Sequence, residues 1–78
     1  MSADESARPT DRELVRGYRP AAFVESRPSP RTGRPQHRVA CPPTDGCRAD
    51  LGPWCASEDR AWAAACLRLG LRLHRIVD

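Results

Sequence analysis

The clearest pattern of apolar and polar positions lies near the end of the sequence, after Ser57. Apolar side chains recur there at intervals of four, three, four and three residues, which places them on one face of an α-helix. The positions on this face are Trp62, Cys66, Leu69, Leu73 and Ile76. Ser57 is a favourable N-cap residue, and the acidic pair that follows it complements the helix dipole. The pattern therefore predicts a C-terminal amphipathic helix whose apolar face forms the core.

Two other faces of this predicted helix carry candidate binding residues. Arg68, Arg72 and Arg75 gather on one face, where they would contact the phosphates of a nucleic acid. Leu67 and Leu71 share another face, and a domain this small cannot bury two apolar faces of one helix. We therefore expect Leu67 and Leu71 to bind a larger protein, or to form a homodimer through this helix.

The sequence before residue 39 has a different character. It contains few large apolar residues and several prolines, so burial cannot offset the entropy lost on ordering it. One exception is expected at residues 11–18, where Thr10 and Glu13 match a helix capping box. Residues 1–38 are therefore predicted to form a flexible, largely disordered Pro/Arg-rich arm that contains one short helix.

Positive charge is concentrated in this arm between Ser26 and Arg38. The stretch holds four arginines and no acidic residue, although the formal charge of the whole chain is only +3. Arg31 and the following Gly33-Arg34-Pro35 look like a degenerate AT-hook, so Arg31, Arg34 and Arg38 are candidate DNA contacts. A solvated linker is the competing interpretation, because all 13 basic side chains are Arg, which is typical of a GC-rich genome.

Four cysteines lie in the second half of the chain. A chain of 78 residues buries too little apolar surface to fold on its core alone, so disulfides or a structural metal are expected. No export signal or membrane-spanning run of apolar residues is visible, which favours a cytoplasmic protein without membrane contact. In that reducing compartment thiols more often hold a metal than pair with each other.

Zinc is the expected cofactor, because tetrahedral sites of this kind combine donors from short loops and from a helix. Cys41, Cys47 and Cys55 lie beside turns in two successive loops. The fourth ligand is Cys66 or His74, and Cys66 is favoured because His74 lies too far along the helix. The competing interpretation of Cys66 is a small buried residue in the apolar stripe. Residues 39–78 are therefore predicted to form a zinc-binding loop-helix module.

A resemblance supports this module over residues 39–66. Val39-x-Cys41-Pro42, followed by Cys47-Arg48-Ala49-x-x-Gly52-x-Trp54-Cys55, resembles the small zinc-finger modules of actinobacteria and their phages. In that resemblance the first three cysteines match the first three ligands, and Cys66 falls near the family's histidine. The first loop here is three residues longer than in the family pattern. The resemblance implies DNA binding.

The expected fold is thus a small, metal-stapled, α-rich domain, in which two Cys-bearing loops precede the C-terminal amphipathic helix. The expected function is that of a zinc-binding accessory or regulatory protein that binds nucleic acid through the basic helix face and the Arg-rich arm. The alternative is a zinc-stapled adaptor that docks on a larger protein complex through the C-terminal helix. No catalytic triad, paired carboxylates or phosphate-binding Gly loop is visible, so an enzyme is not expected.

Overall fold

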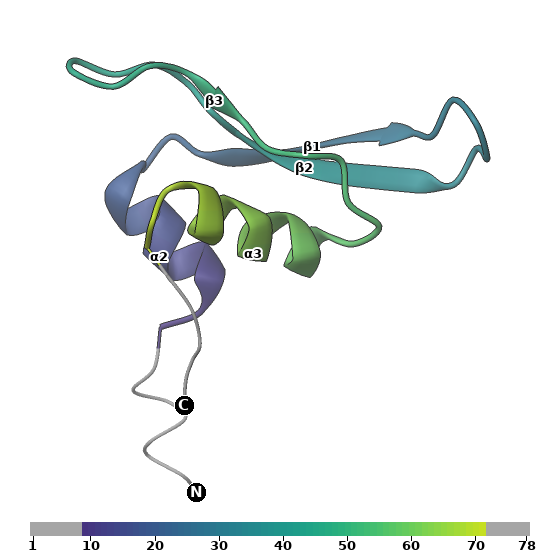
Figure 1. Ribbon diagram of the computed structural model, residues 1–78, viewed down its shortest axis with the longest axis horizontal. Helices are drawn as coiled ribbons and strands as arrows, with labels where there is room; N and C mark the ends of the chain where they lie inside the picture. The colour runs from purple at the N-terminus through teal and green to yellow at the C-terminus, as the bar shows by residue number, and fades with distance from the viewer. Residues whose placement is uncertain (1–8, 72–78) are drawn as a thin grey trace, which may run out of the picture.

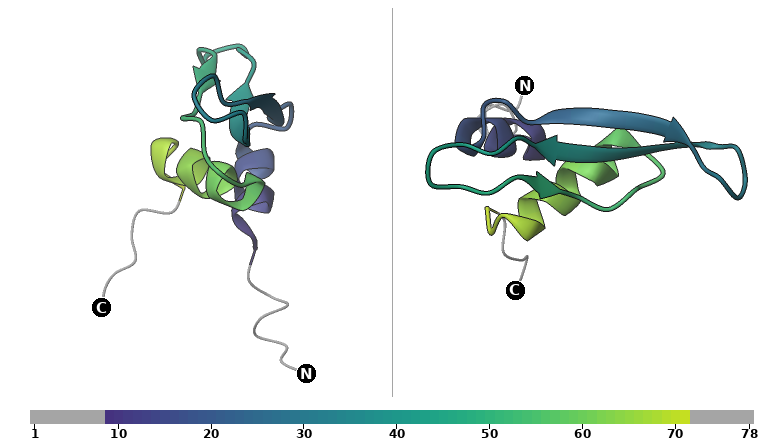
Figure 2. Two further views of the ribbon diagram at one scale, coloured as in Figure 1. Left: turned by 90° about the vertical axis from the view of Figure 1, so that its right-hand side faces the viewer. Right: turned by 90° about the horizontal axis from the view of Figure 1, so that it is seen from above.

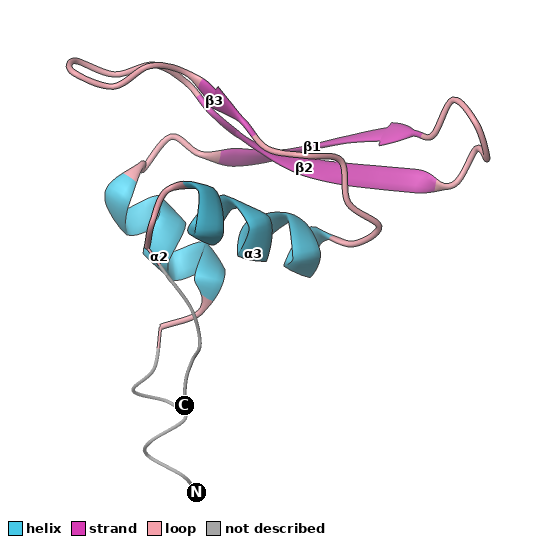
Figure 3. Cartoon of the chain, in the orientation of Figure 1, coloured by secondary structure: helices cyan, strands magenta, loops and turns pink. Residues whose placement is uncertain are grey.

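Two helices cover one face of a three-stranded antiparallel sheet in the computed structural model, which describes residues 9–71 (Figures 1 and 3). The elements in chain order are α2 (Asp11–Tyr18), β1 (Phe23–Pro28), β2 (Pro35–Cys41), β3 (Asp50–Leu51) and α3 (Glu58–Arg68). The strands lie side by side in the order β1-β2-β3. Views from the side and from above agree that neither helix of these residues lies on the opposite face of the sheet (Figure 2).

The prediction of an α-rich fold with a largely disordered arm is wrong. The described chain has similar amounts of helix and strand, and the segment predicted to be an arm supplies α2, β1 and the first half of β2. The boundary expected between residues 38 and 39 falls inside β2. The physical reason is that β1 and β2 each need the other strand and the helices to bury their apolar residues. Neither segment therefore shows a long apolar run.

The pairing of β1 with β2 places an apolar pair on one face of the sheet and a charged pair on the other. Val24 pairs with Val39, and both pack toward the helices. Their neighbours Glu25 and Arg38 pair with each other on the opposite face. At the end of the ladder Pro28 pairs with Pro35, where two residues that lack an N–H lose little hydrogen bonding.

The strand that follows β2 is short and bulged. Leu51 pairs with Ala40, and pairing resumes at Cys55, which exchanges two backbone hydrogen bonds with His37, of 2.7 and 2.8 Å. The register of Leu51 would have placed Cys55 opposite residue 36, so the chain gains one residue here, as in a β-bulge. The bulge turns Trp54 onto the uncovered face while Cys55 stays beside the core.

Local signals set both helix starts. The Thr10 hydroxyl accepts from the Glu13 amide at 3.1 Å and the Glu13 carboxylate accepts from the Thr10 amide at 2.9 Å, which completes a capping box. Ser57 caps α3 by accepting from the Arg60 amide at 3.2 Å. α3 ends at Arg68, and Gly70 then adopts a φ of 74°, the left-handed conformation common after a helix. Leu73 and Ile76 lie outside the described residues.

The core lies between the helix pair and the sheet. Its buried members are small or medium-sized apart from one tryptophan: Val15, Ala22, Val39, Cys41, Ala61, Trp62, Ala65 and Cys66. Five of these eight come from the two helices and the rest from the sheet and the turn before it. Each half of the chain therefore depends on the other for burial.

Arg19 fixes the end of α2 against the loop between β2 and β3. Its side chain is almost wholly buried, and its Nη2 donates to the carbonyl oxygens of Pro42 at 2.7 Å and Arg48 at 2.9 Å. These two bonds connect Arg19 to both ends of the loop and hold the ends together. Hydrogen bonds from a charged group are among the stronger ones in proteins, so Arg19 takes a structural role that its charge alone does not predict.

Candidate nucleic-acid interface

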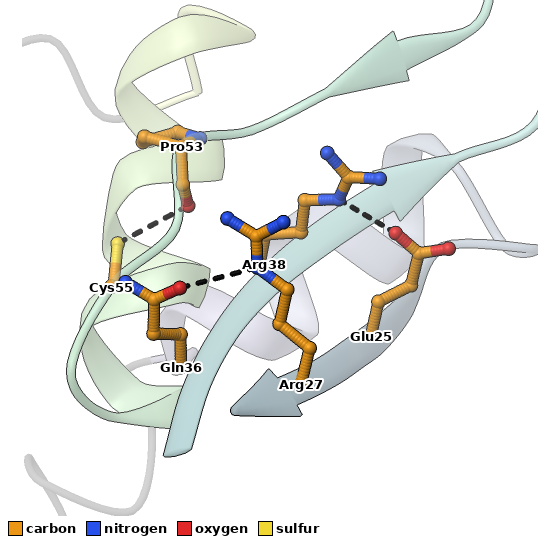
Figure 4. Close-up of polar contacts among 6 residues, drawn as sticks. All are labelled: Glu25, Arg27, Gln36, Arg38, Pro53 and Cys55. Atoms are coloured by element: carbon orange, nitrogen blue, oxygen red, sulfur yellow. Dashed lines mark hydrogen bonds and ion pairs between the residues drawn. The ribbon is translucent and has the colours of Figure 1, made fainter. Parts of the chain in front are cut away.

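The uncovered face of β1 and β2 is polar and rich in arginine. Residues at alternate positions point away from the helices, and we call the set Glu25, Arg27, Gln36, Arg38 and Trp54 the outer face. Figure 4 shows four of these side chains on the side of the sheet away from the helices. None of them belongs to the buried core, so this face of the sheet is accessible to a ligand.

Two arginine guanidinium groups lie against the ring of Trp54. The Arg27 guanidinium lies 4.1 Å from the centroid of the ring and that of Arg38 lies 4.5 Å from it. Contacts of this kind are electrostatically favourable because the ring face is electron-rich. Two long, flexible side chains from two strands are thus held against one rigid surface.

Polar neighbours fix the same two arginines from the other side. Arg27 Nε donates to Gln36 Oε1 at 3.2 Å, and Arg38 Nε forms an ion pair with Glu25 Oε1 at 2.6 Å (Figure 4). Each arginine uses Nε for its neighbour in the sheet. The Nη groups of both side chains can therefore donate to a ligand in a preset orientation.

The turn between β1 and β2 places two more arginines at the tip of the hairpin. The Ser29 hydroxyl accepts from the Arg31 and Thr32 amides at 3.2 and 3.3 Å, and the Ser29 amide donates to the Arg34 carbonyl at 2.7 Å. Gly33 takes a φ of 77°, which closes the turn. Arg31 and Arg34 are exposed, so an ordered turn carries the two positive charges predicted for a mobile arm.

The basic face expected on the C-terminal helix is only partly described. Arg68 donates from Nη2 to Asp50 Oδ1 at 2.7 Å and from Nε to Asp50 Oδ2 at 3.3 Å, and this hydrogen bonding raises the pKa of its guanidinium. Arg68 is therefore engaged in an ion pair with Asp50 of β3, although about half of its side chain remains exposed. Arg72 and Arg75 lie outside the described residues.

The two leucines predicted to bind a partner differ in their surroundings. Leu67 is 60% exposed on α3, whereas Leu71 is partly buried and packs against the core. Leu71 takes part in folding because the chain turns back at Gly70 and the Leu71 amide bonds to the Cys66 carbonyl at 2.9 Å.

The four cysteines lie in different surroundings. Cys41 and Cys66 are buried in the core, Cys47 closes the turn that begins at Thr44, and Cys55 is partly buried beside β2. The Cys66 thiol donates to the Asp11 carbonyl at 3.3 Å, and that of Cys55 to the Pro53 carbonyl at 3.4 Å (Figure 4).

This placement does not assemble a metal centre from residues 9–71. Within that part of the chain no three His, Cys, Asp or Glu side chains come together in a way that could hold a metal ion. The alternative ligand His74 lies outside it. Burial raises the pKa of the Cys41 thiol, with Arg19 acting in the opposite direction and Asp50 adding to the rise. A neutral thiol in an apolar core is a packing group, and zinc binding stays a prediction without geometric support here.

Sequence reasoning missed Arg27 and Trp54 as a pair. Trp54 gives no such signal in the sequence. Arg27 could have been found from two short segments, Phe23-Val24-Glu25-Ser26-Arg27 and Gln36-His37-Arg38-Val39, which lie on either side of a turn that contains Gly33. The prolines at the ends of both strands concealed this signal, because they are typical of interruptions in a disordered arm.

No helix in residues 9–71 has both the length and the apolar character needed to cross a bilayer. Comparison of the chain with protein-family models, with curated proteins and with solved structures gave no match.

Proposed function

We propose that this protein binds nucleic acid through the outer face and the tip of the β1–β2 hairpin, as a small accessory or regulatory protein of the cytoplasm. The observation that carries the proposal is the stacking of Arg27 and Arg38 on Trp54, next to the exposed Arg31 and Arg34. Four arginines thus share one hairpin whose residues 26–38 include no acid.

Phosphate groups suit this arrangement. Guanidinium groups bind phosphate oxygens through paired N–H donors, and Arg27 and Arg38 keep their Nη donors for that purpose. Their orientation is set before binding by Trp54, Gln36 and Glu25, so little side-chain entropy is lost when a ligand arrives.

The distribution of acidic residues supports the same surface. Four of the acids lie in the first turns of the two helices, at Asp11, Glu13, Glu58 and Asp59. The helices cover the other face of the sheet (Figure 1). Arginines on the same two helices balance these acids, so a polyanion is attracted mainly toward the hairpin.

A salt-dependent binding titration tests the proposal. We expect the protein to bind a fluorescein-labelled 20-base-pair DNA duplex, with an affinity that falls as KCl rises because bound phosphates release counterions. The double variant R31Q/R34Q should bind more weakly and reduce the slope of log K against log salt by about 2, since each lost contact removes about 0.9. The variant R12Q/R16Q makes the same charge change on exposed positions of α2 and should bind like wild type. Equal losses in the two variants would reject the hairpin as the binding surface.

A protein partner is the second candidate, favoured by the exposure of Leu67 on α3. Docking of an apolar helix face is nearly insensitive to salt, which separates it from phosphate binding. Leu67→Asp is the suitable variant for this test, because Leu71 packs against the core and its substitution would affect folding as well.

A further inference from the structure

The β1–β2 hairpin extends past the helices. In Figure 1 and in the view from above in Figure 2, the ends of both strands and the turn between them lie beyond α3 and beyond the loop that precedes it. The projecting part is a ribbon only two strands wide. Paired strands are about 4.8 Å apart, so such a ribbon fits a groove about 12 Å wide.

The projecting part ends in an ordered, basic turn. In addition to the bonds of the Ser29 hydroxyl and amide, the Arg34 amide donates to the Thr32 hydroxyl at 3.2 Å and the Gly33 amide donates to the Ser29 carbonyl at 2.8 Å. Hydrogen bonds within residues 29–34 thus order the backbone of the turn. Arg31 and Arg34 leave this turn from fixed positions, with Arg27 and Arg38 set back along the strands.

Trp54 is the aromatic residue of the outer face, and its ring is already occupied. Binding of single strands depends on open aromatic rings on which unpaired bases stack. The Trp54 ring instead holds Arg27 and Arg38 at 4.1 and 4.5 Å, so a base would have to displace a favourable contact to stack there. The outer face therefore presents hydrogen-bond donors for phosphates and for base edges, and it does not present an open ring on which a base can stack.

From these observations we infer that the ligand is double-helical DNA, with the tip of the β1–β2 hairpin in the major groove and with Arg27 and Arg38 on the flanking phosphates. This inference rests on the proposed function. The major groove of B-DNA admits a two-stranded ribbon, and Arg there pairs with the O6 and N7 atoms of guanine. Double-stranded RNA is a poorer ligand, because its A-form major groove is too deep and narrow for side chains to read.

Two measurements on the full chain test the inference. The first compares the affinity for a 20-base-pair DNA duplex, for one of its strands and for an RNA duplex of the same sequence, at one salt concentration. The second is dimethyl sulfate footprinting at saturating protein, which reports guanine N7 in the major groove and adenine N3 in the minor groove. We expect tightest binding to duplex DNA and protection of guanine N7. In R31Q/R34Q we expect a loss of that protection and binding weaker by about tenfold or more.

The outcomes separate this inference from the proposed function. Binding to all three nucleic acids, with the single strand or the RNA duplex bound as tightly as the DNA duplex, would overturn the inference and leave the proposed function standing. Protection confined to adenine N3 would do the same. Absence of binding to any of the three would overturn both. Circular dichroism of R31Q/R34Q is the control for folding, and we expect the wild-type spectrum because both substituted residues are exposed in the turn.

Discussion

The guanidinium of Arg27 lies 4.1 Å from the centroid of the Trp54 ring, although 26 positions of sequence separate the two residues, from 28 to 53. The contact forms because β1 and the segment after β3 both lie alongside β2. It joins the stability of the sheet to the orientation of the arginines that we propose to bind phosphate.

Replacement of Trp54 tests that connection. Trp54→Ala should lower the free energy of unfolding by about 1–2 kcal/mol, because two cation–π contacts at a partly exposed site are lost. DNA affinity should fall as well, since Arg27 and Arg38 lose their support. Trp54→Phe keeps an aromatic ring and should lose less of both quantities. Urea unfolding and anisotropy measure the two effects, and equal losses in the two variants would contradict a role for the ring face.

Arg19 should be among the most sensitive positions in the chain. Arg19→Ala leaves the carbonyl groups of Pro42 and Arg48 without their donor, and we expect it to destabilise the protein by about 2–4 kcal/mol. Arg48→Ala is the matched control, because Arg48 contributes only its backbone carbonyl to this contact and its side chain is exposed. It should change stability by less than about 0.5 kcal/mol in urea unfolding. A small effect of Arg19→Ala would show that the loop does not depend on this contact.

Two glycines should respond in opposite directions to alanine. Gly33 has a φ of 77°, which a side chain disfavours, so Gly33→Ala should cost about 1–2 kcal/mol and disturb the hairpin tip. Gly17 lies within α2 with nothing near the position of an added Cβ, so Gly17→Ala should stabilise the protein by up to about 1 kcal/mol. Thermal unfolding measures both changes. A stabilising Gly33→Ala would mean that the turn has another conformation in solution.

The burial of Cys41 predicts a dependence of stability on pH. Burial raises the pKa of this thiol above the ordinary value of 9.0, so the unfolded chain loses its proton first as the pH rises. The contribution of Cys41 is complete below about pH 9 and decreases above it. Urea unfolding between about pH 7 and 10 should show a smaller decrease for Cys41→Ala than for wild type, whatever the absolute stability of the variant. Parallel curves would contradict this assignment.

The positions of the thiols predict how the protein responds to a chelator. Because Cys41 and Cys66 are packed in the core, we expect EDTA to leave the circular dichroism and melting temperature unchanged. Iodoacetamide should modify Cys47 and Cys55 in the native protein and reach the other two only on unfolding. Loss of helical signal with EDTA, together with one zinc per chain in the untreated protein, would establish the zinc site that the cysteine spacing predicts.

Local interactions explain what can be read from the sequence. The capping box of Thr10 and Glu13 and the N-cap at Ser57 depend on residues three positions apart, and both are present. The apolar stripe through Trp62 and Cys66 does face the core. The density of arginine between residues 26 and 38 is likewise a property of the sequence alone.

The sequence by itself therefore determined where the helices begin, which face of the last helix is buried and where positive charge is dense. Only the tertiary structure decided that the segment predicted to be an arm forms β1 and part of β2, and that Arg27 and Arg38 contact Trp54. The physical reason is that capping and helical periodicity act over a few residues, whereas a strand is stabilised by partners distant in sequence. Val24 acquires a partly buried position only when Val39 lies beside it and the helices cover both.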